Sequence, residues 1–182
     1  MADIDVVGIL KQLGETDLGK QLLDVLTSTE MPKVIQKEAL GEGTHGNYSP
    51  GENTVKLNWR LPYSDKDIQT NVVAHELMHA ANTQMGNAMY GKGSKFPKDL
   101  KAEIDKFSTW QGEVPFGKLI EKTEPGSFYR SDWGERNAFG VGNTLAKKSI
   151  RPVSHADATA ATENAIKLDL FLRGFKQMKA QK

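Results

Sequence analysis

The chain contains no cysteine among its 182 residues. This absence excludes a disulfide scaffold, a thiolate metal site and a thiol nucleophile. Any metal ion must therefore be bound by histidine, aspartate or glutamate side chains.

A strong charge of one sign is also missing. Twenty-four Lys and Arg residues stand against 23 Asp and Glu residues, which gives a net charge of +1. A chain with this balance has no overall field to attract nucleic acid or an anionic membrane, and we expect neither as a partner.

Long apolar runs are absent as well, and the first residues of the sequence are not those expected of a secretory signal. Asp3 and Asp5 stand where a signal would carry Lys or Arg. No apolar stretch has the length of a transmembrane helix. We therefore expect synthesis in the cytoplasm without a Sec signal, and secretion by a specialised system into a target cell stays an open alternative.

The length fits one domain, which we expect to span residues 1–182. Apolar spacing predicts two helices near the start of the chain, over 3–13 and 17–28. Two strands are predicted after them, over 33–38 and 54–59. The turn-rich stretch 41–53 between these strands is an expected hairpin connection or rim loop.

A longer helix is predicted in the middle of the chain. Ser64 followed by Asp67 matches an N-cap box, and no Gly or Pro interrupts the chain from there until Gly86. The helix is therefore expected over 65 to about 84. Further helices are predicted over 98–110, from 131 or 132 onward, and from Ser154 onward.

The middle helix carries His75-Glu76-Leu77-Met78-His79. Residues four apart lie on one face of a helix, so His75 and His79 can direct ring nitrogens at the same ion. Glu76 lies about 100° round the helix from His75, where it can take a proton from a water that the ion activates. The spacing predicts two metal ligands and a general base.

An alternative interpretation makes these residues structural. The flanking positions are apolar on nearly all sides, so the helix should be buried all round. His75 and His79 would then be hydrogen-bonded core histidines, and Glu76 would face solvent. We favour the metal site because one ion satisfies all three polar side chains. His45, in the Gly-rich stretch, is expected to be exposed and not a ligand.

The segment from Val72 to Ala80, Val-Val-Ala-His-Glu-Leu-Met-His-Ala, resembles the active-site helix of the zincin metallopeptidases. The stretch 48–58 looks like the strand entry of the bacterial effector and polymorphic-toxin branch of that group. The resemblance covers about residues 20–145. It implies an α+β fold, in which a mainly helical zincin-like domain carries a small antiparallel β-sheet over the active-site helix, and Zn²⁺ as the cofactor.

The metzincin branch of the zincins is excluded. That branch requires Gly three residues after the second histidine and another His three residues further on, where this chain has Asn82 and Met85.

A catalytic zinc usually has three protein ligands and one open position. Glutamate-type zincins take their third ligand from a later helix, and residues 133–139, Trp-Gly-Glu-Arg-Asn-Ala-Phe, resemble their Glu-x-x-Ala segment. The resemblance implies Glu135 as this ligand, in preference to Asp132 or His155. Ala138, one turn on, would let that helix pack close to the active-site helix.

The reaction also needs a donor to the developing oxyanion. Tyr129, Arg130, Arg136 and His155 are the candidates. We choose Tyr129 as the catalytic residue because it directly precedes the segment of the expected third ligand.

In zincins a strand before the active-site helix forms the upper edge of the cleft, where an extended substrate can pair with it. The resemblance thus implies that the strand over 54–59 forms this edge. The same strand and the long loop over 111–130 would then set specificity.

Together these features predict a zinc-dependent endopeptidase that acts on a protein or peptide, of the kind delivered as a bacterial effector or toxin. Such proteins also imply a cognate immunity or inhibitor protein as a partner. A cell-wall peptide is an alternative substrate. The alternative from another class is a non-catalytic metal-binding regulatory or interaction domain on a zincin fold, and Glu76 argues against it because a binding module needs no base.

Overall fold

The computed structural model describes residues 4–41, 44–58, 65–107, 132–146 and 155–180. Helices and strands follow one another along the chain as α1 (Val6–Leu13), α2 (Asp17–Ser28), β1 (Lys33–Glu38), β2 (Gly46–Ser49), β3 (Thr54–Asn58), α3 (Lys66–Tyr90), α4 (Lys98–Phe107), α6 (Asp132–Leu145) and α7 (His155–Ala180). The described part is mainly helical with one small sheet, which confirms the α+β class.

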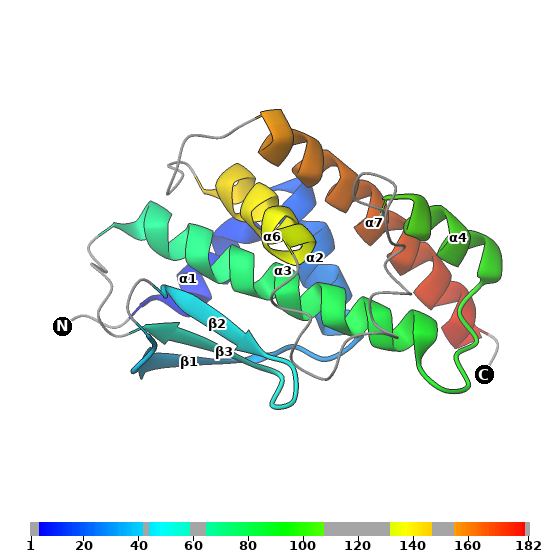
Figure 1. The fold of residues 1–182 in the computed structure, drawn as a ribbon, viewed down its shortest axis with the longest axis horizontal. Coiled ribbons are helices and arrows are strands. Elements are labelled where there is room, and N and C mark those ends of the chain that lie inside the picture. The colour runs from blue at the N-terminus through cyan, green and yellow to red at the C-terminus, as the bar shows by residue number, and fades with distance from the viewer. Residues whose placement is uncertain (1–3, 42–43, 59–64, 108–131, 147–154, 181–182) are drawn as a thin grey trace.

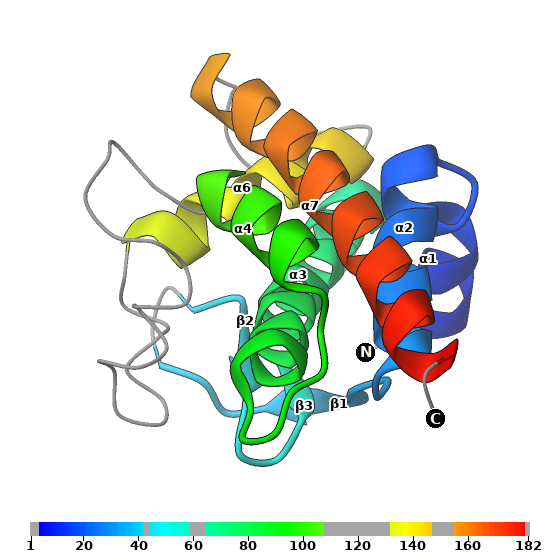
Figure 2. The same cartoon turned by 90° about the vertical axis from the view of Figure 1, so that its right-hand side faces the viewer.

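Helix α3 is the centre of the molecule (Figure 1). It packs against α6, α2 and α1 and against strands β2 and β3. Figure 2 looks along α3 and shows the sheet on one side of it and α6 and α7 on another. Every residue from Thr70 to Asn82 is buried, as predicted for a helix that is apolar on nearly all sides.

The ends of α3 differ from the prediction. Asp65, and not Ser64, is the N-cap residue, and its carboxylate accepts a hydrogen bond from the backbone N–H of Asp67 at 3.0 Å. The helix also continues past Gly86 to Tyr90. A glycine inside a helix costs about 1 kcal/mol, and burial of Met89 in the core outweighs that cost.

The sheet has three strands in the order β1-β3-β2. Strand β1 pairs parallel to β3, and β2 pairs antiparallel to β3 with Gly46 opposite Leu57. The sheet is therefore mixed, and the prediction of an antiparallel sheet was wrong. The reason is β2, which lies inside the expected loop 41–53 and takes the antiparallel place beside β3, so that β1 can reach only the far edge of β3.

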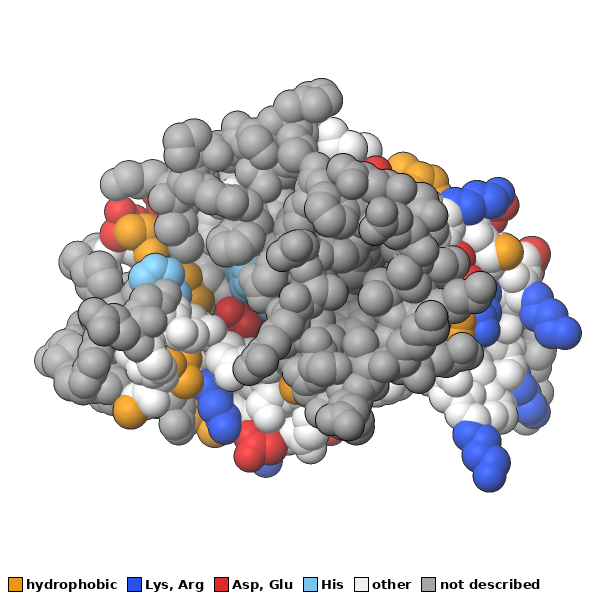
Figure 3. Space-filling model, viewed as in Figure 1, with side chains coloured by type: hydrophobic (Ala, Val, Ile, Leu, Met, Phe, Trp, Pro, Cys, Tyr) orange, Lys and Arg blue, Asp and Glu red, His pale blue; other side chains and the backbone are white. Residues whose placement is uncertain are grey.

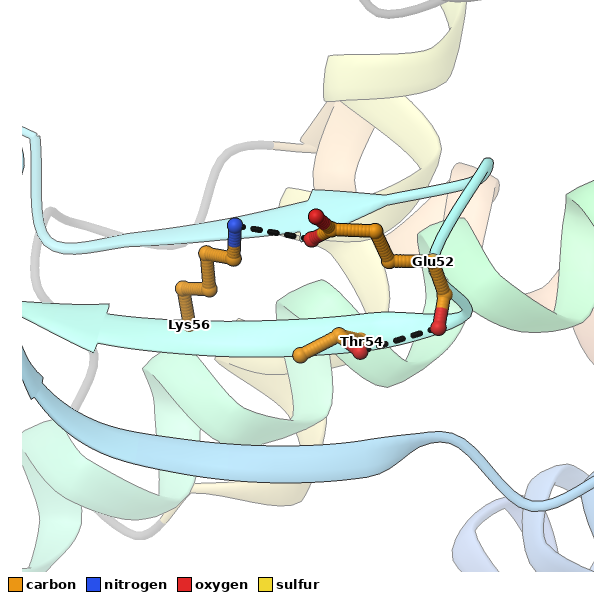
Figure 4. Close-up of polar contacts among 3 residues, drawn as sticks. All are labelled: Glu52, Thr54 and Lys56. Atoms are coloured by element: carbon orange, nitrogen blue, oxygen red, sulfur yellow. Dashed lines mark hydrogen bonds and ion pairs between the residues drawn. The ribbon is translucent and has the colours of Figure 1, made fainter.

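Polar contacts hold the hairpin of β2 and β3. The Tyr48 hydroxyl donates to Asn53 Oδ1 at 2.9 Å, and burial raises the pKa of Tyr48 to about 12. On the solvent side, Lys56 Nζ lies 2.8 Å from Glu52 Oε2 (Figure 4), and this hydrogen bond lowers the pKa of Glu52. Thr54 Oγ1 donates to the carbonyl of Glu52 at 3.0 Å and tightens the entry to β3.

The helices after α3 agree with the predicted order. Helix α4 covers most of 98–110, α6 starts at Asp132, and α7 starts at His155. Among the described helices, none combines the length and apolar character that a bilayer crossing requires.

Candidate metal centre

The three polar residues of the motif are buried, but slightly less completely than their apolar neighbours on α3. His75 is 8%, Glu76 5% and His79 5% exposed, whereas all the remaining residues from Val73 to Ala81 are 0% exposed. Figure 3 shows histidine and acidic side chains in a hollow of this face of the molecule. We call Val72, His75, Glu76 and His79 the site face of α3.

The two histidine rings converge. His75 Nε2 lies 3.1 Å from His79 Nε2, and the rings meet edge to face with centroids 4.8 Å apart. At this distance the two nitrogens cannot both carry hydrogen, so at least one directs a lone pair at the other. Two ligand nitrogens on a tetrahedral zinc would lie about 3.3 Å apart, given Zn–N bonds of about 2.0–2.1 Å. The 3.1 Å separation of the two nitrogens is therefore close to that of two ligands on one metal ion.

The structural alternative required Glu76 to face solvent, but Glu76 is only 5% exposed. Its side chain is buried against strand β2, where Gly46 lies directly over it. A buried carboxylate is stabilised by a partner of opposite charge or by a strong hydrogen-bond donor. A divalent cation held by His75 and His79 would be a partner of opposite charge for Glu76.

Strand β2 and helix α6 flank the site face on two sides. Gly46 of β2 touches Val72 and Glu76, and Gly142 of α6 approaches the backbone carbonyl of Asn71. Asn71 Nδ2 also donates to Asn143 Oδ1 at 2.8 Å. The motif thus lies between a strand edge and a packed helix.

The direction of α6 bears on the third ligand. In Figure 1 α6 runs back across α3 in the opposite general sense. Because the two helices run in opposite directions and Gly142 lies beside Asn71, residues earlier in α6 lie beside residues later in α3, in the direction of His75. Glu135 precedes Gly142 by about two helical turns, so its backbone falls on the face that Ala138 and Gly142 share.

Ala138 is completely buried where α6 packs on α3, as predicted for close packing. The backbone of Asp132 falls about 80° round α6 from Gly142, away from this shared face. His155 starts α7, which packs against α6, α4 and α2.

The structure does not describe the remaining predicted site groups. The side chains of Glu135, Asp132, Arg136 and His155 lie outside what it describes, although their backbones belong to α6 and α7. Tyr129 and Arg130, together with the rest of the loop 111–130, lie outside the described residues altogether. Within the described part of the chain, no cluster of three or more His, Asp or Glu side chains could hold a metal.

The strand that borders the site is not the predicted one. Strand β3 has neighbours on both sides, so it cannot be the edge at which a substrate adds. The edge next to α3 is β2. Asn58 N–H donates to the carbonyl of His45 at 3.0 Å, and by the alternation of an antiparallel ladder Gly46 and Tyr48 direct their backbone groups away from β3.

Two residues near the motif were not identified as site residues from the sequence. Gly46 looked like one turn glycine among several, and only its contact with Glu76 sets it apart. Asn82 follows His79 by one turn on α3, and both its amide atoms are buried without a hydrogen bond in the described structure. His45 is exposed, as predicted.

Comparisons with known proteins give no relative. No protein-family model matches the chain, and neither the curated proteins nor the solved structures contain a significant match.

Proposed function

We propose that this chain is a zinc-dependent endopeptidase. The observation that carries the proposal is the convergence of His75 Nε2 and His79 Nε2 at 3.1 Å, beside the buried carboxylate of Glu76 on the same helix. Two imidazoles and a carboxylate so close together are the groups that a zinc ion and its general base require.

His75, His79 and Glu135 would hold the zinc, and the fourth position would stay open for water. Zinc bound there would lower the pKa of a water toward about 7 and would polarise the peptide carbonyl. The Glu76 carboxylate accepts the proton of the attacking water and passes it to the leaving amine. Tyr129 is the proposed donor to the oxyanion, from the segment just before α6.

The substrate is proposed to be a protein or peptide bound in extended form. Strand β2 offers an edge directly beside Glu76, and Gly46 directs its backbone N–H and C=O away from β3 at that edge. Addition of a substrate strand would use these groups and leave side-chain pockets to set specificity. Strand β2, and not β3, is therefore the proposed strand edge of the cleft.

The sequence resemblance also supports a biological setting. We propose a bacterial effector or toxin that is delivered into a target cell by a specialised system. A cognate immunity or inhibitor protein would then protect the producing cell.

The test is proteolysis by zinc-loaded protein, compared with Glu76→Gln and with Glu52→Gln as a matched control. A mixture of unfolded proteins serves as substrate, and new N-termini are read by mass spectrometry. We expect cleavage by the wild type and by Glu52→Gln, and a loss of at least about 100-fold in Glu76→Gln with zinc retained. Zinc binding without cleavage by the wild type would overturn the peptidase and favour the metal-binding regulatory domain.

A further inference from the structure

Position 46 has no room for a side chain. A Cβ built on Gly46 would lie 2.9 Å from both Cγ and Oε1 of Glu76, and 2.9 Å from Cγ1 of Val72. Carbon atoms in ordinary contact are about 3.5–4.0 Å apart. Any residue other than glycine must therefore displace both of these side chains or shift the backbone of β2.

Of the two neighbours, Glu76 is the one that can move further. Val72 is β-branched, and in a helix such a side chain has one strongly preferred χ1 rotamer. Val72 also belongs to the hydrophobic core and is only 4% exposed. Glu76 ends in a flexible chain whose carboxylate can rotate, so the larger displacement would fall on the catalytic group.

We propose that Gly46 is a positioning residue for Glu76. Because Gly46 has no side chain, the Glu76 carboxylate can lie against the backbone of β2. It lies beside the strand edge where a substrate strand would add. The same glycine thus sets the distance between the general base and the substrate backbone. This inference rests on the proposed function, because it assigns Gly46 a part in the same reaction.

Gly51 provides a matched control in the same hairpin. A Cβ at Gly51 meets nothing within 4 Å. Gly51→Ala and Gly46→Ala therefore add the same methyl group to the hairpin, and only one of them meets Glu76.

The first readout is kinetic. In the zinc-loaded protein we expect Gly46→Ala to lower kcat about 10- to 100-fold, as expected for a catalytic group moved by about 1 Å. KM and the zinc content should stay at wild-type values. Gly51→Ala should leave kcat, KM and zinc content unchanged. An unchanged kcat in Gly46→Ala would overturn the proposal.

The second readout does not depend on activity. The ¹³C resonance of the Glu76 carboxyl carbon, assigned by its loss in Glu76→Gln, should shift in Gly46→Ala and stay in place in Gly51→Ala. No shift in Gly46→Ala would overturn the proposed positioning, whatever the activity. A shift in a protein whose wild type cleaves nothing would instead overturn the proposed function, and with it the catalytic meaning of the contact.

A second variant covers the case in which Gly46→Ala does not fold. Gly46→Ala/Val72→Ala removes the Cγ1 atom that the new methyl group would meet and keeps the contact with Glu76. We expect this double variant to fold and to keep the loss in kcat and the shifted resonance. Wild-type kcat in the double variant, compared with Val72→Ala alone, would contradict the role of Gly46.

Discussion

Gly142 of α6 lies against Asn71 of α3 so closely that a Cβ at Gly142 would be 2.9 Å from the backbone carbonyl oxygen of Asn71. A backbone oxygen inside a buried helix cannot rotate away as a side chain can. The contact therefore fixes how near α6 comes to the helix that carries the motif. It also fixes where the first turn of α6, with Glu135, stands relative to His75.

Gly142→Ala should move α6 away from α3. We expect a loss of about 1–3 kcal/mol in the free energy of unfolding, which is usual for overpacking, and weaker zinc binding because the proposed third ligand, Glu135, belongs to α6. Urea unfolding and zinc titration measure the two effects. Thr144→Ala, an exposed position on the same helix, should change neither. If Gly142→Ala keeps the wild-type zinc affinity, α6 does not supply a ligand to the zinc.

Asn82 and Asn71 should respond in opposite ways to replacement by leucine, which has the same branched shape. Asn71 Nδ2 donates to Asn143 Oδ1 at 2.8 Å, so Asn71→Leu should cost about 1–3 kcal/mol of unfolding free energy. Asn82 is 1% exposed, and its amide makes no hydrogen bond in the described structure, so Asn82→Leu should be neutral or stabilising. Thermal unfolding of both variants decides. An equal loss in Asn82→Leu would show that its amide is bonded.

Lys167 should make stability depend on pH. Its side chain is buried in α7, and burial lowers its pKa from 10.5 to about 7, against the opposing effect of Glu163. Between pH 7 and 10 the unfolded state then binds more protons than the folded state. The free energy of unfolding should therefore rise with pH across this window, by a few kcal/mol. Below pH 7 lysine is charged in both states, and the rise should be absent.

The control for this pH dependence is a second lysine of α7. Lys167→Met should remove most of the rise between pH 7 and 10, whereas exposed Lys176→Met should keep it. Denaturant midpoints at half-unit steps of pH provide the comparison. A rise of equal size in Lys167→Met would mean that other groups cause it.

The sequence predicted those elements whose signals are local. Helix 17–28 and strand 33–38 were predicted with their observed bounds, since apolar spacing and the flanking turn residues mark both. The buried motif helix was recognised from its apolar residues on all sides. Its capping residue was misassigned because Ser64 and Asp65 are adjacent and both can cap a helix.

The elements that were missed depend on tertiary contacts. Residues 46–49 read as a turn because Gly46 and its neighbours disfavour strands, and only pairing with β3 and packing on α3 make them β2. Strand order is not written in any single segment, so the mixed sheet and the true edge strand could not be predicted. The convergence of the two histidines could be predicted from helical spacing alone. The contact of Gly46 with Glu76 could not, because it depends on how β2 packs on α3.

A zinc site formed by two histidines and one glutamate requires one zinc ion per chain, and elemental analysis measures this stoichiometry. Wild type and the variants His75→Ala, Glu135→Ala, Asp132→Ala and His155→Ala are purified, reconstituted with zinc and desalted. We expect one zinc per chain in the wild type, its loss in His75→Ala and Glu135→Ala, and its retention in the other two. A wild type that holds no zinc or other divalent metal after reconstitution would contradict the account, and His75 and His79 would then be a hydrogen-bonded pair of the core.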